Sequence, residues 1–333
     1  MAVSSTGVPL FAGIEDIDDM FITTMDELDK EVGDEITIPH PVWKYLKDNK
    51  LIEYRDDIGN YVPVRVLDKP NSTVRTFTHY DDVDNTPQDA LSEAKFAYGH
   101  LVGTQMYSRE ELVKNSGRTQ LIDLVETKQQ QLEISMSNTF GATLMGSQDA
   151  NGRDFMGLGR VMSVNASCGG IDPTQPGFGY WNPQQGVKSG GGSYSLATEF
   201  RDGFRRLERL CTYRGYRPTV FLCGEDLYDA FQSWAETKLQ LRIDDLKDQR
   251  GWGDFEMFPY NGRTIIYDTD MPAKQGWLID FKDSVKLRIH RGTNFTFNPW
   301  QMMESKVAKK RDCLVYAALY VKRRNSCGTI TYT

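Results

Sequence analysis

Cysteine and histidine are scarce in this sequence, and neither residue type is grouped. The five cysteines are scattered and form no CxxC pair. They favour free thiols in a reducing compartment over the disulfide framework of a small secreted protein. The four histidines, His40, His79, His100 and His290, are isolated and form no HExxH motif or other metal-ligand spacing. We therefore expect no metal and no cofactor.

Three further absences narrow the classes of protein to which this chain can belong. No run approaches about 18 apolar residues, so we expect no membrane-spanning helix. The N-terminus lacks a basic start followed by an apolar run, so we expect no secretory signal. No GxSxG motif is present, and the glycine-rich stretch Ser189–Ser193 lacks the lysine of a phosphate loop. The sequence therefore predicts no enzyme, and an enzyme with a dispersed active site is the remote alternative.

The charge of the chain is unevenly distributed. The 333 residues, enough for a sizeable core, have a formal net charge of −7. The first 35 residues carry ten acidic residues and one basic residue, a charge of −9, so the remainder is nearly neutral. An acidic arm in front of a balanced body predicts only weak, non-specific contact with nucleic acid and no membrane binding.

Residues 14–32 have the spacing of an amphipathic helix. Apolar side chains recur every three or four residues with acidic residues between them. Such a helix can dock on its own domain or on another subunit, and the pattern does not decide between these. The apolar positions are Ile14, Ile17, Phe21, Met25, Leu28 and Val32.

We expect a short helix within residues 40–50 and strands within residues 52–107. Residues 62–66 and 96–106 alternate in polarity as half-buried strands do. The acidic turn between them contains Asp81, Asp82 and Asp84. Few aliphatic residues support these strands, which favours an extended two-stranded excursion. A hairpin in an ordinary sheet is the alternative.

A long helix is the strongest local prediction. Residues 108–111 have the form of a capping box. From about Thr119 to Met145 the chain contains no proline, and Gly141 is its only glycine. An apolar stripe includes Leu132, Met136 and Phe140. At about 1.5 Å per residue this helix is roughly 40 Å long, nearly the width of a compact globule of this size.

Alternating helices and strands follow a turn-rich stretch at residues 146–193. We expect helices at 196–213 and 225–241, and strands at 218–223, 264–267 and 277–280. Residues 285–289 and 313–321 predict closing strands. The helix at 196–213 and its exit are rich in arginine. This indicates a solvated or inter-subunit face, with a nucleic-acid contact as the alternative. The arginines are Arg201, Arg205, Arg206, Arg209, Arg214 and Arg217.

This order of parts resembles that of the major capsid proteins of tailed bacteriophages, which have the Hong Kong 97-type fold. Residues 108–145 (SREELVKNSGRTQLIDLVETKQQQLEISMSNTFGATLM) resemble the spine segment of that family. The stretches GLGRVMSV, CGGID and YWNP resemble its post-spine loop. The resemblance covers roughly residues 50–330.

The resemblance implies an α+β fold made of five parts. These are an N-terminal arm (1–50), a β-hairpin E-loop with flanking strands (51–107), a P-domain spine helix with a glycine-rich loop (108–193), an α/β A-domain (194–280), and closing P-domain strands (281–333).

The function it implies is structural. The chain would self-assemble through hexamers and pentamers into the icosahedral shell around a double-stranded DNA phage genome. Its partners would be other copies of itself and scaffolding, portal or decoration proteins, and it would lie in the virion capsid after assembly in the host cytoplasm. An encapsulin-like bacterial compartment is the main alternative. The expected inter-subunit contact residues are Ile17, Phe21, Leu28, Asp81, Asp82, Asp84, Arg201 and Arg205.

Overall fold

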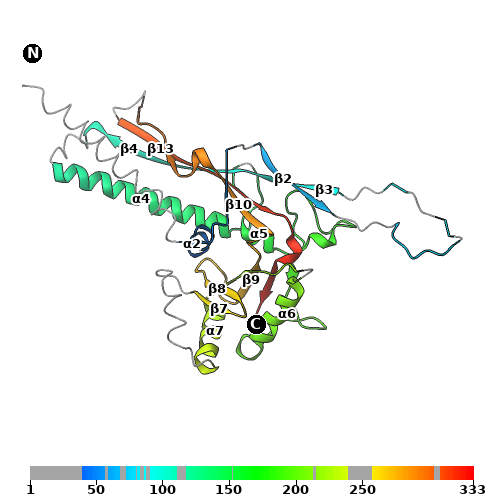
Figure 1. The fold of residues 1–333 in the computed structure, drawn as a ribbon. Helices are drawn as coiled ribbons and strands as arrows, with labels where there is room; N and C mark the ends of the chain where they lie inside the picture. Colours follow the sequence, from blue (N-terminus) through cyan, green and yellow to red (C-terminus); the bar gives the residue numbers. More distant parts are fainter. Residues whose placement is uncertain are drawn as a thin grey trace, which may run out of the picture.

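The computed structural model has two sheets with separate helices and one projecting hairpin (Figure 1). It describes residues 40–56, 59–67, 73–79, 81–82, 86–87, 91–110, 118–151, 153–212, 215–238, 257–303 and 308–333, with residues 118–126, 235–238 and 257–259 described as backbone only. The predicted helix at 14–32 lies outside these residues. Mixed α+β content, as predicted, is confirmed. None of the helices in the described ranges is long and apolar enough to cross a membrane.

The first sheet is organised around one long strand, β13 (Ala308–Val321). Its order is β1-β10-β13-β11, with β4 and β12 also paired to β13. β13 and β4 run antiparallel in register from Ala308 opposite Ser108 to Ala317 opposite Gly99. The other strands are β1 (Ile52–Arg55), β4 (Gly99–Ser108), β10 (Val285–His290), β11 (Thr296–Phe297) and β12 (Gln301–Met302).

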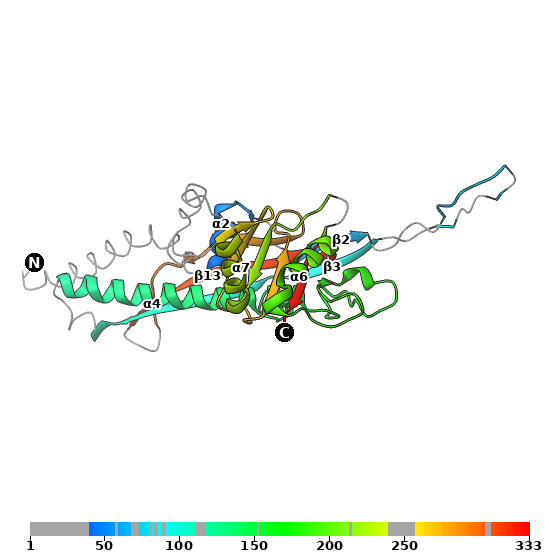
Figure 2. The ribbon, with the colours of Figure 1, turned by 90° about the horizontal axis from the view of Figure 1, so that it is seen from below.

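The predicted long helix is confirmed as α4 (Arg118–Met145), which has 28 residues. It lies along β4 (Figures 1 and 2). A Cβ on Gly103 of β4 would come within 2.6 Å of the Leu132 side chain, so this glycine lets helix and strand approach closely. Met136 and Phe140, which belong to the predicted apolar stripe, are buried.

A buried arginine also joins α4 to the first sheet. Arg311 of β13 is 3% exposed and donates to Oε1 of Gln105 on β4 (2.9 Å) and Oε1 of Gln129 on α4 (3.2 Å). Its guanidinium stacks on Phe297 and Trp300, with its carbon 4.1 and 4.9 Å from the ring centres. Three elements therefore meet at one charged side chain.

The short helix α2 (Pro41–Asp48) closes the other end of α4. Its Trp43 ring lies edge-on to Phe140 of α4, with ring centres 4.7 Å apart, and 6.2 Å from Phe295. These aromatic contacts belong to the larger of two hydrophobic cores. The prediction of a short helix within residues 40–50 is confirmed.

The second sheet has its own core. Its order is β5-β14-β9-β6-β8-β7, and β6 and β8 run parallel. Phe204 of α6, Phe221 of β6 and Phe231 of α7 pack edge to face in this core. The strands are β5 (Gln184–Gln185), β6 (Val220–Cys223), β7 (Met257–Tyr260), β8 (Arg263–Tyr267), β9 (Gln275–Ile279) and β14 (Gly328–Thr331), and the helices are α6 (Leu196–Cys211) and α7 (Glu225–Lys238).

The strand pairing differs from the predicted division at the end of the chain. The five-part division stays a prediction, but β14 pairs with β9 and β5 in the second sheet rather than with the closing strands of the first. Ile330 and Tyr332 are buried in the core of the second sheet. The C-terminal residues therefore complete the α/β sheet, because their apolar side chains face α6.

The hairpin of β2 (Tyr61–Leu67) and β3 (Leu91–Ala97) forms a separate two-stranded sheet. Between it and the second sheet lie the short helix α5 (Leu158–Met162) and the 3-10 turn η1 (Gly179–Trp181). Two further 3-10 turns, η3 (Arg291–Thr293) and η4 (Arg324–Ser326), follow β10 and β13.

One predicted alternation, over residues 96–106, is wrong in its second half. Phe96 and Tyr98 are buried, but Val102 and Met106 are 58% and 42% exposed. The strand is interrupted at Tyr98, and β4 begins at Gly99, where a Cβ would overlap the backbone of Phe155. Beyond this point Gln105 and Tyr107 are the buried residues of β4. Val102 and Met106, which the alternation predicted to be buried, therefore lie on the exposed face.

Candidate assembly surface

The β2–β3 hairpin buries one face and exposes the other. The two strands pair from Tyr61 opposite Ala97 to Leu67 opposite Leu91. Val62 and Phe96 on one face are 2% and 0% exposed, whereas the final pair, Leu67 and Leu91, is 72% and 62% exposed. The hairpin therefore packs on the body through one face along both strands, and its last pair, on the outward face, is exposed.

Apolar side chains continue into the described residues beyond the strands. Val74 is 80% exposed and Phe77 is 63% exposed. Figures 1 and 2 both show the described segment 73–79 beyond β2 and β3, away from the two six-stranded sheets. With Leu67 and Leu91 they form a group of exposed apolar residues, which we call the hairpin tip. Exposed apolar groups of this kind mark protein contact sites.

The base of the hairpin packs on the loop after α5. The Lys95 backbone N–H donates to the Gly169 carbonyl (2.9 Å). Gly169 has a φ of +63°, and a Cβ there would come within 2.7 Å of the Phe96 ring. Glycine is therefore required both by the backbone conformation and by the contact with β3. This loop sets where the hairpin leaves the body.

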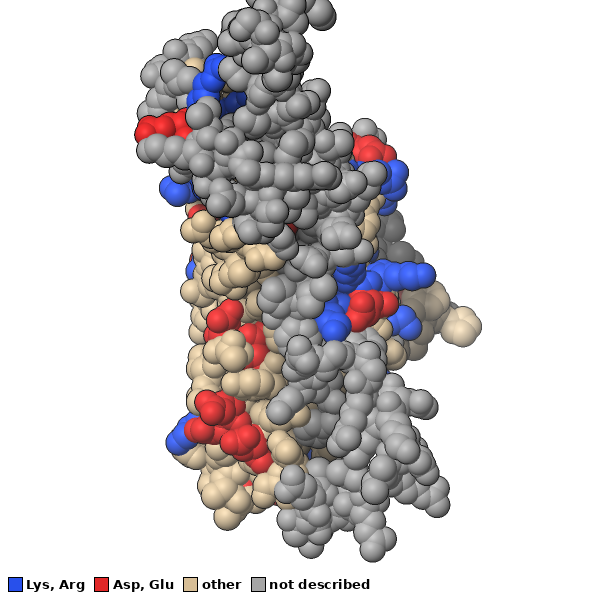
Figure 3. Space-filling view, turned by 90° about the vertical axis from the view of Figure 1, so that its left-hand side faces the viewer, with Lys and Arg blue, Asp and Glu red and all other residues tan. Residues whose placement is uncertain are grey.

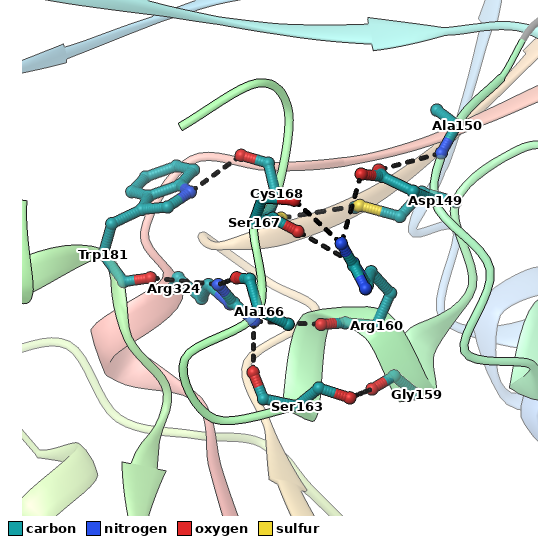
Figure 4. A network of polar contacts seen from close by, with 11 residues as sticks. Asp149, Ala150, Gly159, Arg160, Ser163, Ala166, Ser167, Cys168, Trp181 and Arg324 are labelled. Carbon is teal, nitrogen blue, oxygen red and sulfur yellow. Dashed lines mark hydrogen bonds and ion pairs between the residues drawn. The ribbon is translucent and has the colours of Figure 1, made fainter. Parts of the chain in front are cut away.

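A single buried arginine holds that loop (Figure 4). Arg324 of η4 is 0% exposed. Burial lowers its pKa, but a guanidinium still stays protonated at neutral pH. It has no carboxylate partner within hydrogen-bonding distance among the described residues, so backbone carbonyls hold its charge. The acceptors are the carbonyls of Arg160, Val161, Ser163, Ala166 and Trp181.

A polar cavity of about 850 Å³ lies between β2 and the first sheet. Inside it, Glu53 accepts hydrogen bonds from the Tyr320 hydroxyl (2.8 Å) and Nη2 of Arg288 (3.0 Å). Burial alone would raise the pKa of Glu53, but these two hydrogen bonds and the positive charges of Arg288 and Lys322 together lower the pKa below its usual value. Its charged lining residues other than Glu53 are all basic: Arg55, Arg65, Arg288, Lys322, Arg323 and Arg324.

The outer face of the first sheet is a second partly apolar surface. Val102 and Met106 of β4 point away from α4 and are exposed. Their partners on β13 are Leu314 and Lys310. Ile134 on α4 is also 58% exposed. The described part of the long α4–β4–β13 unit therefore presents apolar side chains on more than one side.

Charge is dispersed on the face shown in Figure 3. Its described lysines and arginines, and its described acidic residues, occur in small groups rather than in one continuous patch. Nucleic-acid-binding faces concentrate basic side chains in a continuous patch or stripe. The described part of this face has no such stripe.

The predicted contact residues fall into separate groups. Ile17, Phe21, Leu28 and Asp84 lie outside the described residues. Asp81 and Asp82 are exposed between β2 and β3, and Asp81 accepts hydrogen bonds from the backbone and the hydroxyl of Thr78 (3.0 and 2.9 Å).

The two predicted arginines lie on α6, in the second sheet's layer. Arg201 stacks on Trp234, 4.4 Å from the ring centre. Arg205 is exposed and lines an open hollow of about 740 Å³ with Arg206, Arg209 and Arg217. The chain therefore does not bring these arginines together with Asp81 and Asp82 (Figure 1).

Sequence reasoning missed Arg324 and Glu53. Arg324 closes the basic run Lys322-Arg323-Arg324, which is typical of a solvated surface. Glu53 stands alone between apolar residues. The available signal was that Arg324 follows the predicted strand 313–321 and Glu53 lies within the strand-rich region 52–107. Their partners come from distant parts of the chain, so no local pattern identifies them.

Solved capsid structures share this architecture. The chain superposes on a protein of the cyanophage A-1(L) capsid asymmetric unit with a TM-score of 0.59 and 13% identity, covering 84% of this chain and 89% of that one. A protein of the capsid of the native GTA particle superposes with a TM-score of 0.53 and 11% identity, covering 87% of this chain and 90% of that one. A protein of the capsid of Myoviridae phage XM1 superposes with a TM-score of 0.52 and 11% identity, covering 86% of this chain and 92% of that one.

These comparisons define the fold. No protein-family model and no curated protein sequence matches the chain. The chain nevertheless has the fold of phage capsid proteins over most of its length, as its resemblance to the major capsid proteins of tailed phages predicted.

Proposed function

We propose that this chain is a structural major capsid protein, which self-assembles into the icosahedral shell around the double-stranded DNA genome of a tailed phage. The observation that carries this proposal is the match of the fold to phage capsid structures over 84–87% of the chain. The hairpin tip supports it, because its apolar residues have no cover within the described part of the chain. This role is structural rather than enzymatic.

The parts of the Hong Kong 97-type fold can be assigned to elements. In this proposal β2, β3 and the residues between them are the E-loop, and α4 is the spine helix of the P-domain. The second sheet with α6 and α7 is the A-domain, and the residues before α2 are the N-terminal arm. The assignment rests on the order of the elements along the chain.

Self-association would use the exposed surfaces described above. The hairpin tip is long enough to reach past its own body and bury Val74 and Phe77 against a neighbour. Its acidic residues Asp81 and Asp82 would meet basic side chains there, such as those around Arg205. Closed rings with such heterologous contacts produce the hexamers and pentamers of a shell. Interfaces of permanent assemblies commonly exceed about 2,000 Å².

Other partners follow from the same role. Scaffolding, portal or decoration proteins would contact the shell, and packaged DNA would touch it only through weak, non-specific contacts. The chain would be assembled in the host cytoplasm and end in the virion capsid. The small, separated charged groups on the described face in Figure 3 agree with weak contact to DNA.

Electron microscopy and sedimentation velocity of the purified chain test this proposal. We expect rings or closed shells, and nuclease-protected DNA in particles purified from infected cells. A monodisperse monomer at high concentration under every salt condition would contradict it. Closed particles that contain a cargo protein and no DNA would instead support the encapsulin-like compartment.

A further inference from the structure

Three side chains that are distant in the sequence meet where α2 contacts the second sheet. His40 precedes α2, and Asp268 and Asp270 follow β8. Nε2 of His40 is 3.6 Å from Oδ2 of Asp268 and 3.6 Å from Oδ2 of Asp270. The Asp268 side chain is 1% exposed, His40 is 13% exposed and Asp270 is 47% exposed. The cluster therefore has a buried end and an open end.

The buried end has polar atoms without hydrogen-bond partners. Oδ1 of Asp268 accepts from the Asp270 backbone N–H (3.0 Å), but Oδ2, which faces His40, accepts no hydrogen bond. Both ring nitrogens of His40 are also buried and unpartnered. Burying such groups costs free energy unless something compensates them. A ligand between the three side chains would do so.

The spacing fits a cation. One ligand atom from each residue lies within 4.8 Å of the other two. Ligands bound at about 2.0–2.1 Å in a tetrahedral zinc site are roughly 3.3 Å apart. The two 3.6 Å separations are close to that value. A small inward movement of Asp270, the exposed member, would complete the geometry.

We propose that His40, Asp268 and Asp270 bind a divalent transition-metal ion, with Zn²⁺ as the best-fitting ion. An imidazole nitrogen with two carboxylate oxygens suits zinc, whereas Mg²⁺ and Ca²⁺ prefer oxygen ligands alone. Three protein ligands leave a fourth position for water at the open end beside Asp270.

The ion would act as a tie between parts of the fold. His40 also lies against Gly141 of α4, where a Cβ would overlap its ring. Asp268 is fixed to the second sheet by its backbone N–H, which donates to the Cys223 carbonyl (3.2 Å). A bound ion therefore connects α2 and the end of α4 to the edge of the second sheet. Because these ligands converge only in the folded chain, metal binding stabilises that state.

Metal retention and thermal stability test the site directly. The full-length chain is incubated with Zn²⁺, passed through a desalting column and analysed by elemental mass spectrometry. We expect about one zinc per chain, a melting temperature that rises with Zn²⁺ concentration, and reversal of that rise by a chelator. Asp270→Asn and His40→Gln should lose both the retained zinc and the melting-temperature rise. His290→Gln, a change at another half-buried histidine, should keep both.

Other outcomes would overturn the site. Asp270 is the most exposed ligand, so Asp270→Asn stays informative even if His40→Gln fails to fold. Zinc retention equal to wild type in Asp270→Asn, or no retained zinc in the wild type, contradicts the proposal. A loss of stability in His40→Gln without any zinc dependence of the wild type would show a simple ion pair instead. Each measurement is made on the dissociated chain and does not depend on shell formation.

Discussion

Arg324 and Trp181 are held to each other and to the same loop. The guanidinium of Arg324 donates to the Trp181 carbonyl (3.1 Å), and the Trp181 indole N–H donates to the Cys168 carbonyl (2.9 Å) (Figure 4). The next residue, Gly169, lies against Phe96 of the hairpin. A chain of direct contacts therefore runs from a buried arginine near the C-terminus to the base of the hairpin.

Replacing Arg324 with methionine should destabilise the chain strongly. The change removes the donors of five backbone carbonyls. Each buried acceptor left unpaired costs about 1–3 kcal/mol, so even with partial rearrangement we expect a loss of about 3–5 kcal/mol. Urea unfolding measures it. Arg323→Met is the matched control, since Arg323 is exposed and stacks on Tyr216, and it should cost under about 1 kcal/mol. Equal losses in both variants would contradict the role of Arg324.

Shortening the hairpin should separate folding from assembly. Leu67 pairs with Leu91, so an Asn-Gly turn in place of residues 68–90 can join the two strands directly. Because both hydrophobic cores lie outside the deleted segment, circular dichroism should keep the wild-type helix signal. Sedimentation velocity should show loss of shells. Wild-type shells from this variant would mean that the hairpin tip is dispensable.

A proline in α4 should prevent folding. Leu132 lies mid-helix against Gly103 of β4. Leu132→Pro removes a backbone donor and should cost about 3 kcal/mol or more, so soluble expression should collapse. Ile134→Ala, a change at an exposed position two residues away, should leave expression near wild type. Normal yield of the proline variant would show that α4 tolerates a break.

Acid should weaken the hydrogen bonds of Glu53 with Arg288 and Tyr320. The pKa of Glu53 is lowered in the folded chain from 4.5, so its carboxylate adds stability above that value and loses it as pH falls through the folded pKa. Glu53→Gln should cost about 1 kcal/mol at pH 7, the difference between a charged and a neutral hydrogen bond. Denaturant titrations at several pH values should show the variant and the wild type converging as the pH falls below 4.5 and through the lowered pKa of Glu53. A constant difference at all pH values would contradict this account.

The five cysteines should be unreactive in the folded chain. All are free and buried, and burial raises the pKa of Cys168 and of Cys327 to about 12 each. The reactive thiolate is therefore rare at neutral pH. We expect no reaction with a thiol reagent under native conditions and five equivalents after denaturation, read by absorbance. Rapid labelling of the native chain would show that the cores open readily.

Long periodic segments of the sequence predicted their structure well. For α4, an uninterrupted apolar stripe without proline predicted the start of the helix to within one residue and its end at Met145. For β13, the apolar run 313–321 identified the strand but not its first five residues, Ala308–Asp312. Four of those five residues are charged, which is not typical of a buried strand, yet Arg311 is buried against Gln105 and Gln129. The hydrogen bonds that compensate the buried charge of Arg311 come from β4 and α4, which lie far away in the sequence.

The sites themselves could not be predicted in this way. Residues 96–106 alternate without a break, and only the close approach of Gly99 to Phe155 reverses which face is buried. His40 was isolated in the sequence because Asp268 and Asp270 reach it only through the packing of α2 on the second sheet. The hairpin was predicted from its thin apolar faces, since this signal is local.

The pairing of α4, β4 and β13 has a mechanical consequence. The ladder from Ala308 to Ala317 and the parallel helix, joined by Arg311, act together as a stiff beam. Bending it anywhere along its length would strain many backbone hydrogen bonds at once. A shell built from this chain would therefore change its curvature at the joints, where Gly99 ends the ladder and the hairpin begins, while each beam keeps its shape.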